Sequence, residues 1–239
     1  MPPTITVSSL EGDHIQAAGA LSRCLLELNY PHAYIGGFAW SLLGSVRPTH
    51  DIDILIKLRD DQVDMMTLRD RLAQMDSHFA TTPLNFYFTC DPVDPQQDVL
   101  QQIAQRTHNV LIETLRTGSL GLPETPEPLF IVEIMKLSLP ILHPSILILT
   151  KLKRWCQTHT STRPLTRRKA MSDRQDIEYL ILWMSNRSMT IDFEQYQGKS
   201  KDTLLALVRE LRDVIHSEDH TEMLGALRNV VTNDDWHLL

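Results

Sequence analysis

The stretch Tyr34–Ile56, "YIGGFAWSLLGSVRPTHDIDILI", places two adjacent glycines ahead of two aspartates that lie inside an apolar run. Alternating residues and several isoleucines after the aspartates are typical of a β-strand. In a strand, residues two apart share one face. Asp51 and Asp53 are therefore expected to point to one side of a sheet, and Ile52 and Ile54 to the other.

Two carboxylates side by side repel each other, and each loses hydration when it is buried. A divalent cation removes both penalties. Carboxylate oxygens commonly hold Mg²⁺, with water and substrate phosphates completing its coordination. Two such ions about 4 Å apart can clamp the attacking and leaving oxygens of a phosphoryl or nucleotidyl transfer. Asp51 and Asp53 are therefore predicted to bind metal and to position a phosphate.

The two glycines are predicted to end a strand and to open a short helix. Glycine lets the backbone approach a phosphate closely, and a helix start offers free N–H donors. Gly36 and Gly37 are therefore candidates to bind the β- and γ-phosphates of a nucleoside triphosphate. Arg47 and Thr49 are candidates for phosphate or pyrophosphate contacts, with a solvated loop as the alternative. His50 is not assigned as a ligand, because Mg²⁺ prefers oxygen.

The chain has 239 residues, 42% of them hydrophobic, which suits one large domain or two small ones. A net charge of −7 argues against a general nucleic-acid binder, although a local basic groove stays open. Three widely spaced cysteines predict neither a zinc cluster nor a disulfide framework. No signal peptide or membrane span is expected, so the predicted location is the cytoplasm, with the nucleus as an alternative.

Hydrophobic periodicity predicts an α/β first part and a helical second part. In the first part the expected helices are 13–28, 38–44 and 60–75, and the expected strands are 33–37, 51–57, 84–90 and 129–136. Residues 108–118 fit a helix or a strand. In the second part the expected helices are 145–157, 173–185, 200–216 and 218–231, with a polar and basic loop over 158–172.

The glycine–aspartate stretch resembles the nucleotidyltransferase superfamily with a DNA polymerase β-like catalytic core. Its arrangement is similar to the branch that includes lincosamide and aminoglycoside nucleotidyltransferases and AbiEii-like toxins. "LPILHPSILILTKLKRW" and "KAMSDRQDIEYLI" are similar to the helical part of that branch, and the intervening Ser/Thr/Arg-rich loop is similar to that of fungal members. The resemblance implies an α+β fold, with a mixed sheet flanked by helices as the catalytic core (1–140). A C-terminal helical region (141–239) is expected to complete the cleft.

The resemblance also implies a third carboxylate on a neighbouring strand. Glu133 in "FIVEIMK" is the best match and is expected to complete the metal and catalytic site, although the family more often has Asp there. Asp91, Asp94 and Glu113 are the alternatives. Lys151 is expected to neutralise triphosphate charge, with a solvated lysine as the alternative.

A second charged region follows Lys151. Four cations are expected in the basic loop, where they could contact triphosphate or an RNA acceptor, or simply be solvated: Arg163, Arg167, Arg168 and Lys169. Asp173 and Asp176 are expected to be structural, bridging to Lys or Arg, with Asp173 as a helix cap.

The implied activity is transfer of a nucleoside monophosphate from a nucleoside triphosphate to an acceptor hydroxyl, with Mg²⁺ or Mn²⁺ as cofactor and release of pyrophosphate. A small molecule or a protein is the favoured acceptor, and a tRNA end is the alternative. A catalytically inactive nucleotide-binding protein and a recruited enzyme of specialised metabolism are the other readings. Convergence of Asp51, Asp53 and Glu133 within metal-binding distance would distinguish the first activity from the inactive protein. The retained pair of Asp51 and Asp53 argues against the recruited enzyme.

Overall fold

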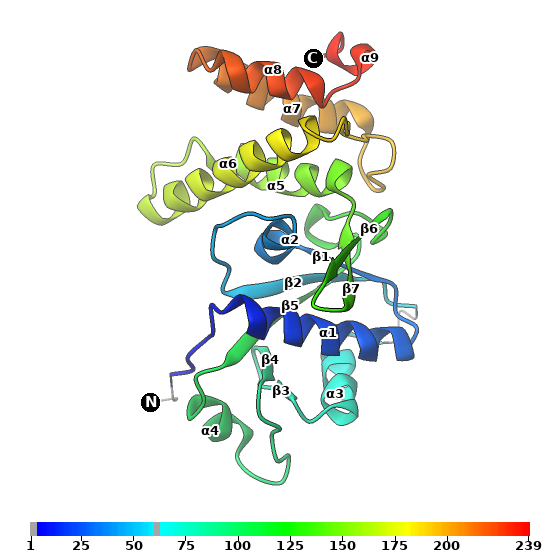
Figure 1. Cartoon of the computed structure of the whole chain (residues 1–239), viewed down its shortest axis with the longest axis vertical. Coiled ribbons are helices and arrows are strands. Elements are labelled where there is room, and N and C mark those ends of the chain that lie inside the picture. The colour runs from blue at the N-terminus through cyan, green and yellow to red at the C-terminus, as the bar shows by residue number, and fades with distance from the viewer. Residues whose placement is uncertain (1–3, 60–62) are drawn as a thin grey trace. The chain divides into compact units, whose positions relative to one another are not determined.

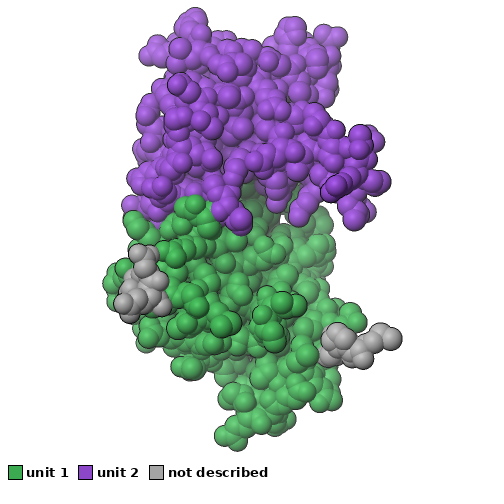
Figure 2. All heavy atoms as spheres, turned by 180° about the vertical axis from the view of Figure 1, so that it is seen from behind, with its two compact units in different colours: residues 1–119, 129–141 green, residues 120–128, 142–239 purple. Residues whose placement is uncertain are grey.

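The computed structural model describes residues 4–59 and 63–239 and confirms the predicted α+β class (Figure 1). The chain forms two compact units, shown in two colours in Figure 2. Unit 1 comprises residues 1–119 and 129–141, and unit 2 comprises residues 120–128 and 142–239.

Unit 1 contains the described strands, except that the last residue of β7 belongs to unit 2. Its elements are α1 (Glu11–Glu27), β1 (His32–Ile35), α2 (Gly36–Leu42), β2 (Asp51–Ile56), α3 (Met65–Met75), β3 (Phe79–Thr81), β4 (Phe86–Thr89), α4 (Val99–Ala104), β5 (Asn109–Arg116), β6 (Leu129–Ile134) and β7 (Leu137–Leu142). Unit 2 is helical, with a 3₁₀ turn at Ser119–Gly121, then α5 (Pro144–Thr158), α6 (Pro164–Ser185), α7 (Lys201–Ser217), α8 (Thr221–Asn229) and α9 (Asn233–Trp236).

The described strands form one mixed sheet in the order β3-β4-β5-β2-β1-β7-β6. β2 is antiparallel to β1 and parallel to β5, and β1 is parallel to β7. β2 is thus flanked by strands on both sides, near the middle of the sheet. This position explains the apolar run that follows the aspartates.

The two faces of the sheet are covered by different helices. Helices α1 and α3 lie on one face, and the short helix α2 lies on the other, beside β1 and β2 (Figure 1). Ile52 and Ile54 are fully buried, whereas Asp51 and Asp53 are half-buried on the face that carries α2. The predicted split of β2 into an apolar and an acidic face is therefore confirmed.

Several elements of unit 1 differ from the expectation. The ambiguous segment 108–118 forms strand β5, and β3, β7 and α4 were not expected. The helix expected over 60–75 is described as α3, whose side-chain cap is Asp64, while residues 60–62 lie outside the described residues. β3 and α4 carry too few residues to show a clear period, and the proline within β7 argues against a strand.

The structure corrects the prediction of a basic loop over 158–172. Helix α6 begins at Pro164, so most of this segment is helical. Proline suits the first turn of a helix, where its missing N–H has no partner to lose. Ala170 and Asp173 are buried further along α6, while Arg163, Arg167, Arg168 and Lys169 are exposed. Asp173 therefore lies inside α6 and does not cap it.

Among the described helices, none has the length and apolar character needed to cross a membrane.

Candidate metal centre

The register of two parallel strands builds the centre. Asp53 on β2 lies opposite Glu113 on β5, and Asp51 lies opposite Leu111. Glu113 is exposed between two buried residues, Ile112 and Thr114, so its side chain points away from the covered face. Since paired residues on neighbouring strands share a face, Glu113 joins the acidic face of β2.

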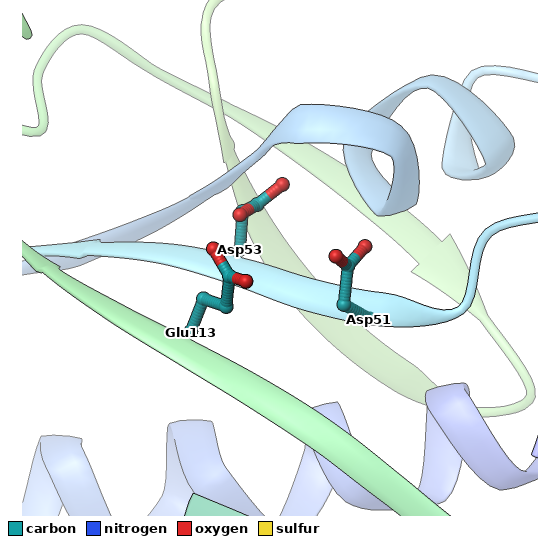
Figure 3. Close-up of side chains that lie close together, drawn as sticks. All are labelled: Asp51, Asp53 and Glu113. Carbon is teal, nitrogen blue, oxygen red and sulfur yellow. The ribbon is translucent and has the colours of Figure 1, made fainter. Parts of the chain in front are cut away.

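Three carboxylates converge at this point. Asp51, Asp53 and Glu113 each offer an oxygen, and these oxygens lie within 4.8 Å of one another. The side chains rise from the same face of the two strands, toward helix α2 (Figure 3). The two aspartates are half-buried and Glu113 is exposed. The described residues form no second group of three potential ligands that meets this spacing.

The donor set suits a hard divalent cation. All three groups supply oxygen, and neither histidine nor cysteine belongs to the group. Oxygen-only carboxylate sites favour Mg²⁺, Mn²⁺ or Ca²⁺ over softer metals. A cation would also remove the mutual repulsion of three anionic groups. The residues present therefore fit a divalent metal.

Gly36 packs directly against this acidic face, and Gly37 packs against the residues that precede it. Gly36 has a φ of +63°, and a Cβ added there would lie 1.7 Å from Oδ2 of Asp53. A Cβ at Gly37 would lie 2.7 Å from Oγ1 of Thr49. Only residues without side chains allow the start of α2 to approach the carboxylates this closely.

Thr49 orients one of the carboxylates. Its Oγ1 lies 3.1 Å from the backbone oxygen and 3.2 Å from Oδ1 of Asp51, so the hydroxyl can donate to either. Arg47 is half-buried, and one of its guanidinium nitrogens lies 3.3 Å from the Cβ position built at Gly37. Arg47 and Thr49 are thus both near the start of α2, whereas His50 is exposed and outside the carboxylate group.

The structure corrects the prediction that Glu133 is the third carboxylate of the group. β6 is at the edge of the sheet, separated from β2 by β1 and β7. Glu133 is exposed there and accepts a hydrogen bond of 2.7 Å from Oγ of Ser138. The alternatives Asp91 and Asp94 follow β4 and are also outside the group. Glu113 takes the place that the sequence favoured for Glu133, because β5 pairs with β2 and β6 does not.

Lys151 has a different setting from the one expected. It is 5% exposed in unit 2, and its ammonium forms ion pairs with Asp176 and, at 3.6 Å, with Asp173. Asp173 also accepts a hydrogen bond of 2.7 Å from Nε of Arg154. Burial lowers the pKa of Lys151, against the opposing effect of the two carboxylates. The bridging role expected for Asp173 and Asp176 is confirmed, and the Lys151 ammonium forms ion pairs with both.

Comparison with solved structures identifies the fold. The chain is similar to the crystal structure of an antigenic nucleotidyltransferase-like protein from Paracoccidioides brasiliensis, with a TM-score of 0.62 and 18% sequence identity. The match covers 96% of this chain and 97% of that chain. Neither the family models nor the curated proteins that were compared include a match to this sequence. The chain therefore has a nucleotidyltransferase-like fold, and its sheet carries an acidic group that could hold a metal ion.

Proposed function

We propose that the protein is a metal-dependent nucleotidyltransferase that moves a nucleoside monophosphate from a nucleoside triphosphate to an acceptor hydroxyl. The observation that carries this proposal is the convergence of Asp51, Asp53 and Glu113 on two parallel strands of a nucleotidyltransferase-like fold. A carboxylate trio that includes Glu113 supports catalysis over nucleotide binding alone. A recruited enzyme that uses no metal would have little reason to keep three mutually repelling carboxylates together.

The three carboxylates would hold Mg²⁺ or Mn²⁺, with Thr49 fixing the orientation of Asp51. A bound cation would neutralise phosphate charge and orient the α-phosphate toward the acceptor. The backbone at Gly36 and Gly37, which starts α2 close to Asp53 and Thr49, would contact the phosphates, and Arg47 is a nearby cation for pyrophosphate. We do not include Lys151 in this set, because it is buried with two carboxylates.

The proposed reaction forms one bond and breaks another. The acceptor oxygen attacks the α-phosphorus, the bond from that phosphorus to the bridging β-oxygen breaks, and pyrophosphate leaves. The hydroxyl proton is lost to a carboxylate or to water. Most of the rate enhancement would come from holding the reactants in line and from charge neutralisation. A small molecule or a protein side chain is our proposed acceptor, and the cytoplasm is the proposed location.

Calorimetric binding of non-hydrolysable ATP, GTP, CTP and UTP analogues, with and without Mg²⁺, tests the proposal. The wild-type protein should bind at least one analogue in a Mg²⁺-dependent manner. Asp51→Asn/Asp53→Asn should lose that binding while remaining folded by circular dichroism. Glu133→Gln is the matched control, because this exposed glutamate is on the same sheet but outside the carboxylate group. Absence of nucleotide binding in folded wild-type protein would refute the enzyme proposal.

A further inference from the structure

The start of helix α6 concentrates positive charge in an acidic chain. Acidic residues outnumber Lys and Arg by 30 to 23 overall, yet residues 152–172 contain no Asp or Glu. Four exposed cations lie at the N-cap and in the first two turns of α6, and together they are called the basic start of α6: Arg163, Arg167, Arg168 and Lys169. This local excess is opposite in sign to the charge of the whole molecule.

The side chains of these four cations have no partner among the described residues. In the described part of the chain, none of their side chains forms an ion pair or a side-chain hydrogen bond. Other cations of the same unit are engaged, such as Arg154 with Asp173 and Arg174 with Glu178. The basic start of α6 therefore presents its charge to solvent rather than using it to join helices.

The placement is electrostatically unfavourable for the isolated fold. Cations destabilise the positive N-terminal end of a helix dipole, and α6 has neither an acidic residue in its first turn nor a side-chain cap. Arg163 and Arg167 are four residues apart, a spacing at which like charges repel. A feature that breaks local rules of helix stability is expected where function requires it.

The chemistry of the patch matches a phosphodiester backbone. Three of its four cations are arginines, whose planar guanidinium binds phosphate oxygens in a bidentate manner. Hydroxyl side chains lie among them and can donate to phosphate: Thr160, Ser161, Thr162, Thr166 and Ser172. The patch covers less than two helical turns, so it offers a short site that suits a flexible single strand.

A membrane surface fits the patch less well. Interfacial helices bury a continuous apolar face in the lipid. The apolar face of α6, which includes Ala170, Ile177 and Leu180, is already buried in the protein. Leu165 and Met171 are the exposed large apolar residues of this region, and basic residues separate them.

We infer that the basic start of α6 binds the phosphate backbone of a single-stranded nucleic acid, for which RNA is the probe. α6 packs along α5 within unit 2 (Figure 1), so the cations project from a helix that is held in place. Binding at this surface needs no contribution from the carboxylate group, so the inference stands apart from the proposed nucleotidyl transfer. If both hold, RNA becomes a candidate acceptor.

Fluorescence anisotropy with a labelled, mixed-sequence RNA strand of about 20 nucleotides tests the inference, since this length exceeds a typical single-strand site. Four phosphate contacts predict a slope of log K against log salt of about −3, or an affinity loss of about 50-fold between about 50 and 200 mM salt. Arg167→Gln/Arg168→Gln/Lys169→Gln should reduce the slope by about 2 units and lower affinity by at least about tenfold at low salt.

Lys57→Gln/Arg71→Gln/Lys136→Gln is the matched control, because it removes the same charge from exposed positions outside the patch. It should retain most of the affinity and the slope. The α6 variant should be at least as stable as wild type to urea, because like-charge repulsion is removed. It should also keep its Mn²⁺ binding, and Asp51→Asn/Asp53→Asn should keep its RNA binding. A DNA strand of the same sequence should show a similar slope, because the expected contacts are to phosphate.

Equal losses in the α6 variant and the matched control would overturn the inference, because net charge alone would then explain binding. Binding to phosphatidylserine vesicles but not to RNA would also overturn it and would indicate a membrane surface instead. Failure of folded wild-type protein to bind RNA at about 50 mM salt would have the same consequence, since phosphate contacts are strongest at low salt.

Discussion

The backbone at Gly36 lies against the carboxylate of Asp53 so closely that a Cβ at Gly36 would be 1.7 Å from Oδ2. The glycine also has a left-handed φ of +63°. Its neighbour Gly37 has the same relation to Thr49, which in turn contacts Asp51. The glycines at the start of α2 thus contact the aspartates of β2, Gly36 directly through Asp53 and Gly37 through Thr49.

Gly36→Ala should damage both stability and metal binding. A non-glycine residue in the left-handed region costs about 1–3 kcal/mol, and the clash with Asp53 adds to this. Relief of the clash requires the Asp53 carboxylate or the start of α2 to move, and either shift disturbs the carboxylate group. Urea unfolding and Mn²⁺ titration measure the two effects.

Gly12→Ala is the control for this substitution. A Cβ at Gly12, in the first turn of α1, meets no atom within 4 Å. Its effect on the free energy of unfolding should stay within about 1 kcal/mol and is expected to be stabilising, because alanine is the better helix former. Equal behaviour of the two variants would contradict the close packing of Gly36 on Asp53.

Thr49→Val should weaken metal binding without unfolding the protein. Valine keeps the shape of threonine but cannot donate a hydrogen bond to Asp51. Loss of an outer-shell hydrogen bond to a metal-binding carboxylate typically reduces metal affinity by about 10–100-fold. Thr49→Ser retains the hydroxyl and should retain most of the affinity. An unchanged Mn²⁺ affinity in Thr49→Val would show that Thr49 does not position Asp51.

Lys151→Met should destabilise the protein by about 3–5 kcal/mol, because it leaves Asp173 and Asp176 buried with reduced charge compensation. Lys151→Met/Asp176→Leu should recover part of the loss, because it removes one of the stranded carboxylates. Urea unfolding followed by far-ultraviolet circular dichroism provides the measurement.

The Lys151 variants also distinguish a structural ion pair from a triphosphate-binding lysine. A structural ion pair predicts that Asp176→Asn is destabilising as well. A lysine that serves only to bind triphosphate predicts that Lys151→Met leaves the free energy of unfolding unchanged. That second outcome would restore the role that the sequence suggested for Lys151.

The sequence predicts the acidic strand and its glycine partners because their signals are local. Alternation places Asp51 and Asp53 on one face, and the paired glycines mark a close approach of the backbone. The third carboxylate is different, since its identity depends on which strand pairs with β2. Glu113 is in a segment whose pattern fits both helix and strand, and pairing with β2 decides the matter. Strand order is a tertiary property that local periodicity does not contain.

The basic segment illustrates the same limit. Its Ser, Thr and Arg content predicts a loop. Pro164, however, is also a good first residue for a helix, and the buried Ala170 and Ile177 anchor the segment. Packing of this apolar side, rather than the polar residues, determines that α6 begins nine residues before Asp173. The basic residues thereby gain a defined position on a helix.

Mn²⁺ binding measured by electron paramagnetic resonance, on wild type, Glu113→Gln and Glu133→Gln, tests the central claim most directly. Wild type and Glu133→Gln should bind Mn²⁺ with the same affinity, and Glu113→Gln should bind it at least about tenfold more weakly. Both substitutions remove one exposed glutamate charge from the same sheet, so only the position differs. Loss of Mn²⁺ binding in Glu133→Gln with retention in Glu113→Gln would contradict the carboxylate group on β2 and β5.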